Sequence, residues 1–173
     1  GEFETVLNEF PGTFARVYEE GFSRKLGLLD PHPGDLDLAR DLLTLLADQE
    51  VDFTLFFRRL TAQVESQDET QSGLHDLFGC ARGFDQWFAK WQERTLQQDS
   101  GDQARTMRAA NPIFIPRNHR VEEEIKAAEQ QNYEPFEKLL EVLARPFEEQ
   151  PGNAGYENPP ESGEVVHATF CGT

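Results

Sequence analysis

The sequence predicts an all-α protein: an irregular bundle of about six to eight helices followed by an irregular C-terminal tail. Apolar residues recur three and four positions apart through most of the chain, which is the spacing of one helix face. No segment shows the sustained apolar–polar alternation of a half-buried strand. The 173 residues include 14 Phe and two Trp, enough large side chains to build a core.

The first apolar stripe begins at Phe3 and continues to Phe22. Pro11 and Gly12 interrupt it, which predicts either a short helix followed by a longer one or a single kinked helix. Gly27 should end this helical segment. Three aspartates in and after the next loop could bind a cation, but we favour roles in turns and at a helix start, where Asp is common. They are Asp30, Asp35 and Asp37.

Further stripes place Leu, Phe and Trp side chains inward. Residues 38–46 form one helix, and Asp52 should cap the next, which carries Phe56 on its inner face. The short link between these helices predicts an antiparallel hairpin. A later helix, up to about Leu96, turns Trp87 inward, and Cys80 near its start should be a small buried hydrophobe. We interpret these stripes as core rather than as a cofactor site.

The composition changes near residue 146, where Pro, Gly, Glu and Asn become dominant. This change divides the chain into a helical domain at residues 1–145 and an irregular tail at residues 146–173. Tyr156 and Phe170 are the tail's candidates for packing onto the helices.

The formal net charge is −16, and both halves of the chain are acidic. A surface of this sign repels phosphate backbones, so we expect no nucleic-acid partner. We expect no membrane span, because no apolar run reaches about 18 residues. No signal peptide opens the sequence, and two Cys are too few for a disulfide scaffold. The four His never fall four residues apart, so we expect no metal site. With so few Cys, we expect a reducing, cytosolic compartment.

The segment at residues 107–125 organises the rest of the chain. Pro112 and Pro116 bracket a short apolar run, which predicts that one helix ends near Ala110 and another begins after an extended stretch. Asn118 is well placed to cap that second helix with its side chain.

We call residues 103–121 the basic segment, because they contain four Arg and no acidic residue. Arg117 and Arg120, with His119 between them, are candidates to contact phosphate or an acidic partner surface. The alternative, which we favour, is that the arginines pair with acidic neighbours within the fold. His119 could be catalytic, but we favour an ordinary role at a helix start. The remaining two arginines of the segment are Arg105 and Arg108.

Five motifs occur in order over nearly the whole chain. They are Lys25-Leu26-Gly27-Leu28; Asp52-Phe53-Thr54-Leu55-Phe56-Phe57-Arg58-Arg59-Leu60; Asn111-Pro112 with Pro116-Arg117-Asn118-His119-Arg120-Val121-Glu122; Pro135-Phe136-Glu137-Lys138-Leu139-Leu140; and the terminal Thr169-Phe170-Cys171-Gly172-Thr173. Together these motifs resemble those of the SelO family, also called YdiU.

The resemblance implies a kinase-like (pseudokinase-related) enzyme that transfers AMP from ATP, with magnesium, onto Ser, Thr or Tyr hydroxyls of proteins. Members of the family are much longer, and their kinase-like part precedes the region matched here. The sequence shows no Gly-rich nucleotide loop, no strand-borne lysine and no Asp-Phe-Gly. We therefore expect no catalytic residue and no bound ATP or Mg²⁺ in this chain. The resemblance also implies a cytoplasmic location in bacteria and a mitochondrial one in eukaryotic relatives.

The resemblance gives Cys171 a role in redox chemistry. Some eukaryotic relatives have selenocysteine at the matching position, and bacterial relatives are implied to pair this cysteine with one in the kinase-like domain. That partner is absent here, so we expect Cys171 to be a free, modifiable thiol and Cys80 to lie out of its reach.

Two functions remain open from the sequence. The chain could be the helical region that supports the kinase-like catalytic domain of the same protein, which would make that domain its partner and proteins the substrates of the whole. It could instead be a stand-alone acidic interaction module without enzymatic activity.

Overall fold

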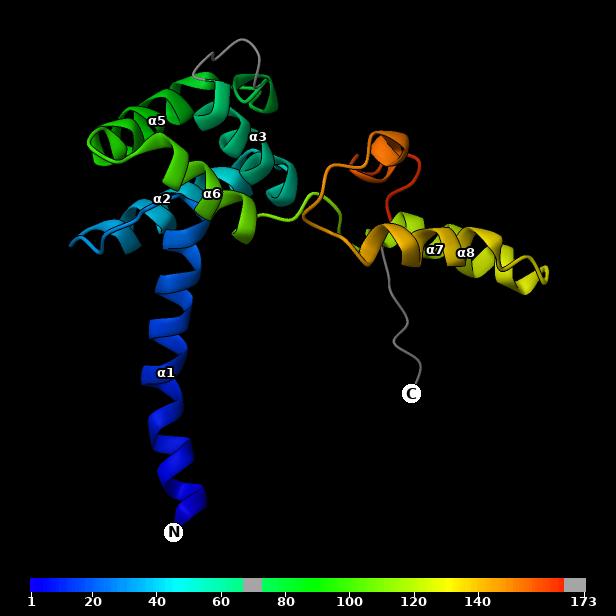
Figure 1. The fold of residues 1–173 in the computed structure, drawn as a ribbon, viewed down its shortest axis with the longest axis horizontal. Coiled ribbons are helices and arrows are strands. Elements are labelled where there is room, and N and C mark those ends of the chain that lie inside the picture. The colour runs from blue at the N-terminus through cyan, green and yellow to red at the C-terminus, as the bar shows by residue number, and fades with distance from the viewer. Residues whose placement is uncertain (67–72, 167–173) are drawn as a thin grey trace. The chain divides into compact units, whose positions relative to one another are not determined.

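The computed structural model describes residues 1–66 and 73–166, and their helices are shown in Figure 1. These residues form seven α-helices and two short 3-10 helices, and no strand occurs among them. The predicted all-α class is confirmed. Contacts divide the chain into two compact units, Gly1–Asn111 and Pro112–Thr173.

The first unit contains five α-helices and one 3-10 helix. They are α1 (Glu2–Lys25), α2 (Asp35–Asp48), α3 (Phe53–Ser66), η1 (His75–Leu77), α5 (Ala81–Thr95) and α6 (Ser100–Ala110). Helix α2 packs on α1 and α5, and α3 packs on α6. The expected α2–α3 hairpin is therefore wrong, because each of the two helices finds its main neighbours elsewhere in the chain.

Aromatic side chains dominate the core of the first unit. Phe56 is fully buried, and Trp87 and Trp91 are nearly so, which confirms the inward faces expected for α3 and α5. Trp87 Nε1 donates to the carbonyl of Leu38 at 2.9 Å, and Trp91 Nε1 donates to that of Leu26 at 2.9 Å. Each indole thus fills the core and satisfies its one donor on the backbone of another element.

Helix α1 is one continuous helix that includes Pro11. Its last helical residue is Lys25, and Gly27 two positions later has a φ of 68°, the left-handed conformation that glycine adopts without strain. The Leu28 N–H then donates to the carbonyl of Ser23 at 2.8 Å, which closes the helix end. In Figure 1 the first turns of α1 project away from the body formed by α2, α3, α5 and α6.

The structure tests two predictions made for residues at helix starts, Asp52 before α3 and Cys80 before α5. Asp52 caps α3, because its Oδ1 accepts the Leu55 N–H at 2.7 Å. Cys80 was expected to be buried, and that expectation is wrong: its side chain is exposed. Cys80 precedes the first residue of α5, so it lies outside the helix's apolar stripe. Its backbone, rather than its thiol, is held, since the N–H and carbonyl of Cys80 bond the Gln49 side chain at 3.0 and 3.1 Å.

The second unit contains α7 (Asn118–Glu129), α8 (Glu134–Leu143) and η2 (Pro151–Tyr156), with α7 and α8 packed together. Its core is small: Ile113, Phe114 and Val142 are buried, and Leu143 and Tyr156 pack against them. The N–H groups of Ile113 and Phe114 donate to the carbonyl of Pro146 at 2.7 and 3.1 Å. The extended run between the two prolines is thereby attached to the end of α8.

The division at Asn111 and Pro112 differs from the compositional boundary drawn at residue 145. Composition marked where helices give way to irregular chain, whereas contacts follow packing. The described part of the tail packs with α7 and α8 in one unit, and Tyr156 holds it as expected. Phe170, Cys171 and the rest of residues 167–173 lie outside the described residues.

Candidate functional site

Two motif segments that are far apart in the sequence meet in the first unit, at the end of α1. The Lys25 ammonium donates to the carbonyl of Ala110 at 3.1 Å and to Asn111 Oδ1 at 3.3 Å. The buried Asn111 amide donates in return to the carbonyl of Lys25 at 2.9 Å and to Thr61 Oγ1 at 3.3 Å. Every polar atom of the Asn111 side chain thus has a partner, and α1, α3 and α6 are joined at one point.

Aromatic rings surround the Lys25 ammonium. Its Nζ lies 5.3 Å from the ring centroid of Phe53 and 5.1 Å from that of Phe57. Burial lowers the pKa of Lys25 from its usual value, because the charged form loses hydration there. The ring faces and the two acceptors offset that cost. The Lys25 ammonium is therefore engaged by groups of the first unit itself.

The arginines of the basic segment that belong to the first unit are paired. Arg105 Nη1 lies 2.6 Å from Asp102 Oδ1, and Arg108 forms an ion pair with Glu65. All four side chains are at least partly exposed, so these pairs stabilise the fold by well under about 1 kcal/mol each. They nevertheless neutralise the positive charge that the sequence shows here.

The two arginines in the second unit attach the tail to the start of α7. The buried Arg117 donates from Nη2 to the carbonyl of Glu157 at 2.8 Å. Arg120 donates from Nη2 to the carbonyl of Gly155 at 3.1 Å and from Nη1 to Glu123 Oε2 at 2.8 Å. The Arg120 guanidinium also lies 5.8 Å from the ring centroid of Tyr156. The hydrogen bond and charge of Glu123 raise the Arg120 pKa.

Asn118 does not cap α7, so that expectation is wrong. Arg117 occupies the capping position in an extended conformation, and its side chain makes no capping hydrogen bond. The Arg117 N–H donates to the carbonyl of Ile115 at 2.8 Å, which turns the chain one residue early. Asn118 is consequently the first helical residue.

Two ionisable side chains on α7 are buried. His119 is 4% exposed and Glu124 is 5% exposed. Burial lowers the pKa of His119, and the nearby Arg120 lowers it further, against an opposing effect of Glu164. Burial raises the pKa of Glu124, and the neighbouring Glu123 adds to the rise. Among the described residues, His119 Nε2 and Glu124 Oε2 have no hydrogen-bond partner.

A hollow of about 410 Å³ lies beside His119 in the second unit. Three of its lining residues are acidic, and one is basic. The acids would repel a phosphate group, and they outnumber Lys126. The residues that line it are His119, Glu122, Glu123, Lys126, Gly163, Glu164, Val165 and Val166.

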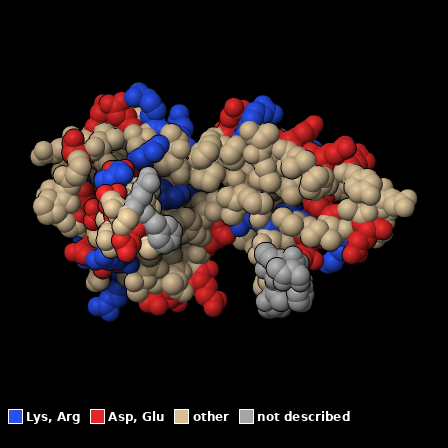
Figure 2. All heavy atoms as spheres, turned by 90° about the horizontal axis from the view of Figure 1, so that it is seen from below, with Lys and Arg blue, Asp and Glu red and all other residues tan. Residues whose placement is uncertain are grey.

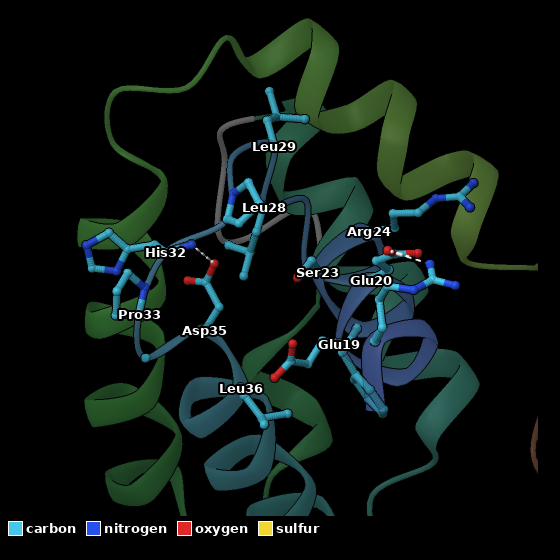
Figure 3. Close-up of a pocket in the computed structure, with 14 residues that line it drawn as sticks. Glu19, Glu20, Ser23, Arg24, Leu28, Leu29, His32, Pro33, Asp35 and Leu36 are labelled. Atoms are coloured by element: carbon cyan, nitrogen blue, oxygen red, sulfur yellow. Dashed lines mark hydrogen bonds and ion pairs between the residues drawn. The ribbon is translucent and has the colours of Figure 1, made fainter. Parts of the chain in front are cut away.

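A larger hollow of about 690 Å³ lies in the first unit, between the last turns of α1 and the loop that leads into α2 (Figure 3). Three of its charged lining residues, Arg16, Glu20 and Asp35, take part in ion pairs. Asp35 accepts the His32 N–H at 2.8 Å and forms an ion pair with Arg94, with Oδ1 2.7 Å from Nε. Asp35 therefore has the turn and helix-start role that we favoured over cation binding. Arg16 and Glu20, at the rim, pair at 2.9 Å.

The described residues present no grouped metal ligands and no helix suited to a bilayer. No three His, Cys, Asp or Glu side chains in residues 1–66 and 73–166 lie close enough together to hold a metal ion. None of the helices in those ranges is both long and apolar enough to cross a membrane. Acidic and basic side chains are interspersed over the surface, as Figure 2 shows for one face.

Fold and contacts together define an acidic, all-α helical region whose motif residues bond to its own backbone. A family model described as protein adenylyltransferase SelO matches residues 1–144. The chain belongs to the SelO family.

Curated relatives match almost the full chain. A protein named protein nucleotidyltransferase YdiU from Methylorubrum extorquens is 48% identical over 182 residues, which cover 100% of this chain and 36% of the relative. Proteins of the same name from Nitrobacter hamburgensis and Rhizobium meliloti are each 45% identical, over 169 and 171 residues. They are covered to 33% and 35% of their lengths. The chain spans about a third of the length of these relatives.

Lys25 and Asn111 both belong to the family motifs, but nothing in the sequence indicates that their side chains bond each other. One signal for a buried role of Asn111 was available. This polar residue stands beside Pro112, at the end of a helix that carries the buried Met107. Glu124 gave no signal, because it stands in a run of three Glu that reads as a solvated helix start.

Proposed function

We propose that this chain is the C-terminal helical region of a kinase-like protein adenylyltransferase and that it supports a catalytic part which the chain does not contain. The observation that supports this proposal is that nearly the whole chain matches about a third of the length of relatives named protein nucleotidyltransferases. The transferred group would be AMP from ATP, and the acceptors would be hydroxyl side chains of proteins.

The described residues do not fit ATP with Mg²⁺. Phosphoryl chemistry needs carboxylates that hold the metal and a lysine placed at the phosphates. Lys25 is bound to Ala110 and Asn111, and Arg120 donates to Gly155 and Glu123. We therefore propose that ATP and magnesium bind in the catalytic part and that this chain contributes stability.

The test replaces the matched segment of the Methylorubrum extorquens relative with this chain and compares three proteins: the parent relative, the chimera and the isolated chain. We expect parent and chimera to transfer AMP from ATP to protein substrates, and the isolated chain to transfer none. Transfer by the isolated chain would contradict the proposal, and so would an inactive chimera beside an active parent.

Calorimetry with ATP and Mg²⁺ gives a second, independent test. The isolated chain should show no binding below about millimolar concentration, because Arg117 and Arg120 already donate to internal acceptors. Micromolar binding that is lost on Arg117→Ala and Arg120→Ala, but kept on Arg16→Ala, would instead make the basic segment a nucleotide site. Arg16 is a suitable control because it lies in an exposed pair on α1.

We also propose that the tail contributes a redox-responsive thiol, Cys171. This residue lies outside the described part of the chain, so the proposal rests on the family resemblance alone. Alkylation of the native chain followed by mass mapping should label Cys171. An unreactive Cys171 would contradict this part of the proposal.

A further inference from the structure

The first four turns of α1 carry a row of exposed apolar side chains. Val6, Leu7, Phe10, Phe14 and Val17 are 54–63% exposed. Their spacing of three and four residues places them on one face of the helix. We call this face the α1 stripe.

Charged residues of α1 avoid this stripe. Glu9, Arg16 and Glu20 follow one another at spacings of seven and four residues, which places them together on one flank of the helix, outside the stripe. The sequence of α1 is therefore amphipathic in the same way as a helix that lies on a core. A row of large apolar side chains with no cover is the kind of surface that marks an interaction site.

Ring contacts connect the stripe to the core of the first unit. Phe10 and Phe14 have their centroids 6.1 Å apart, Phe14 and Tyr18 5.9 Å, and Tyr18 and Phe22 4.7 Å. Phe22 in turn lies 6.5 Å from Phe53. The aromatic row thus begins at the packed end of α1 and continues along the projecting turns without interruption.

The projecting turns also lack support of their own. Pro11 removes one backbone hydrogen bond inside the helix, and Gly12 next to it is a poor helix former. Most helices of this length owe their stability to packing of the apolar face rather than to propensity. A helix with these two residues at its centre needs a covering surface to remain fully formed.

We propose that the α1 stripe docks on the part of the full-length family protein that lies outside this chain. This inference rests on the proposed function. About two thirds of the length of the relatives has no counterpart here, which supplies an occupant in the same polypeptide. A second copy of this chain fits less well, because two chains of net charge −16 repel each other.

The test uses paired substitutions in two contexts. Phe10→Asp with Phe14→Asp places two charges in the stripe. Asn8→Asp with Ala15→Asp places two charges on exposed positions of the polar side of α1 and serves as the matched control. Both pairs are introduced into the isolated chain and into the Methylorubrum extorquens chimera described above.

In the isolated chain, both pairs should leave the melting temperature within about 2 °C of the parent, because all four positions are exposed there. In the chimera, the stripe pair should lower it by about 5 °C or more, and the control pair should not. Amides of residues 4–17 should exchange with solvent at least tenfold more slowly in the chimera than in the isolated chain.

Each other outcome contradicts the proposal. Equal effects of the two pairs in the chimera would mean that the stripe does not dock there. Sedimentation of the isolated chain as a dimer that dissociates on the stripe pair would assign the stripe to a second copy. Slow exchange of residues 4–17 in a monomeric isolated chain would mean that the chain covers its own stripe. A chimera that keeps AMP transfer but shows no stripe effect would remove this inference and leave the proposed function intact.

Discussion

Replacing Asn111 by Ala tests the junction of α1, α3 and α6 directly. The substitution removes the two donations from Nδ2, to Lys25 O and Thr61 Oγ1, and the acceptor for the Lys25 ammonium. Each neutral bond contributes about 0.5–1.5 kcal/mol and a bond to a charged group about 1.5–3 kcal/mol. The ammonium keeps its bond to Ala110, and the shell around it is only partly buried, so we expect a total loss of about 2–4 kcal/mol.

Urea unfolding followed by tryptophan fluorescence is the appropriate assay. Both tryptophans of the chain, Trp87 and Trp91, lie in the first unit, so the signal reports that unit alone. Asn8→Ala is the matched control, because Asn8 is exposed on α1, and it should change the free energy of unfolding by less than about 0.5 kcal/mol. A loss under about 0.5 kcal/mol for Asn111→Ala would refute the view that this residue joins the three helices.

Lys25→Met separates the two halves of the junction. It keeps an apolar stem against Phe53 and Phe57 but removes the ammonium, whose charged form is already disfavoured by burial. We therefore expect it to cost less than Asn111→Ala. The reverse order would show that the ammonium, rather than the amide, dominates the junction.

Further predictions concern the core, the pH response, the tail and the thiols. Trp87→Ala and Phe56→Ala should each lower the free energy of unfolding by about 3–5 kcal/mol in urea titrations, and losses near zero for both would contradict their burial. The folded-state pKa of His119 lies below 6.5, so between that value and 6.5 the unfolded chain binds more protons; stability should fall as the pH falls through this window. His119→Gln should remove that slope in thermal melts followed by circular dichroism, and an unchanged slope would exclude His119 as its source. Arg117→Ala should speed proteolysis at residues 155–160 more than Arg145→Ala, whose pair with Glu148 is exposed, and equal rates would contradict the attachment of the tail. Cys80 should react with alkylating reagents in the native chain, and a protected Cys80 would contradict its exposure.

The helices were predictable because their signals are local. Apolar spacing, the Asp52 cap and Gly27 at a helix end each depend on a few consecutive residues, and each is confirmed. The partners of each face were not predictable in the same way. The α2–α3 hairpin followed from a short link, but a short link limits distance without fixing which faces meet.

Burial at helix ends was also beyond local reasoning. Cys80 precedes α5 by one residue and has an extended backbone, so the helical spacing that predicts the core does not apply to it. The role of Asn111 was hidden for a different reason. Its partner Lys25 lies 86 residues away, and no periodicity connects two positions at that separation. The candidate site is therefore visible only in the folded structure, although its residues belong to the family motifs.

Arginine side chains bond the backbone of other segments in this acidic chain. Among the residues that the structure describes, several arginines donate to backbone carbonyls of loops or of η2 rather than only to carboxylates: Arg59 to Gly73, Arg94 to Asp30, Arg117 to Glu157 and Arg120 to Gly155. A guanidinium has five N–H donors in a fixed fork, so one arginine can satisfy a loop carbonyl and a carboxylate together, as Arg94 and Arg120 do. Loop carbonyls have no helical partner, and arginine supplies one from a neighbouring helix. In the second unit, Arg117 and Arg120 of the basic segment hold the chain after α8 in this way, through the carbonyls of Glu157 and Gly155.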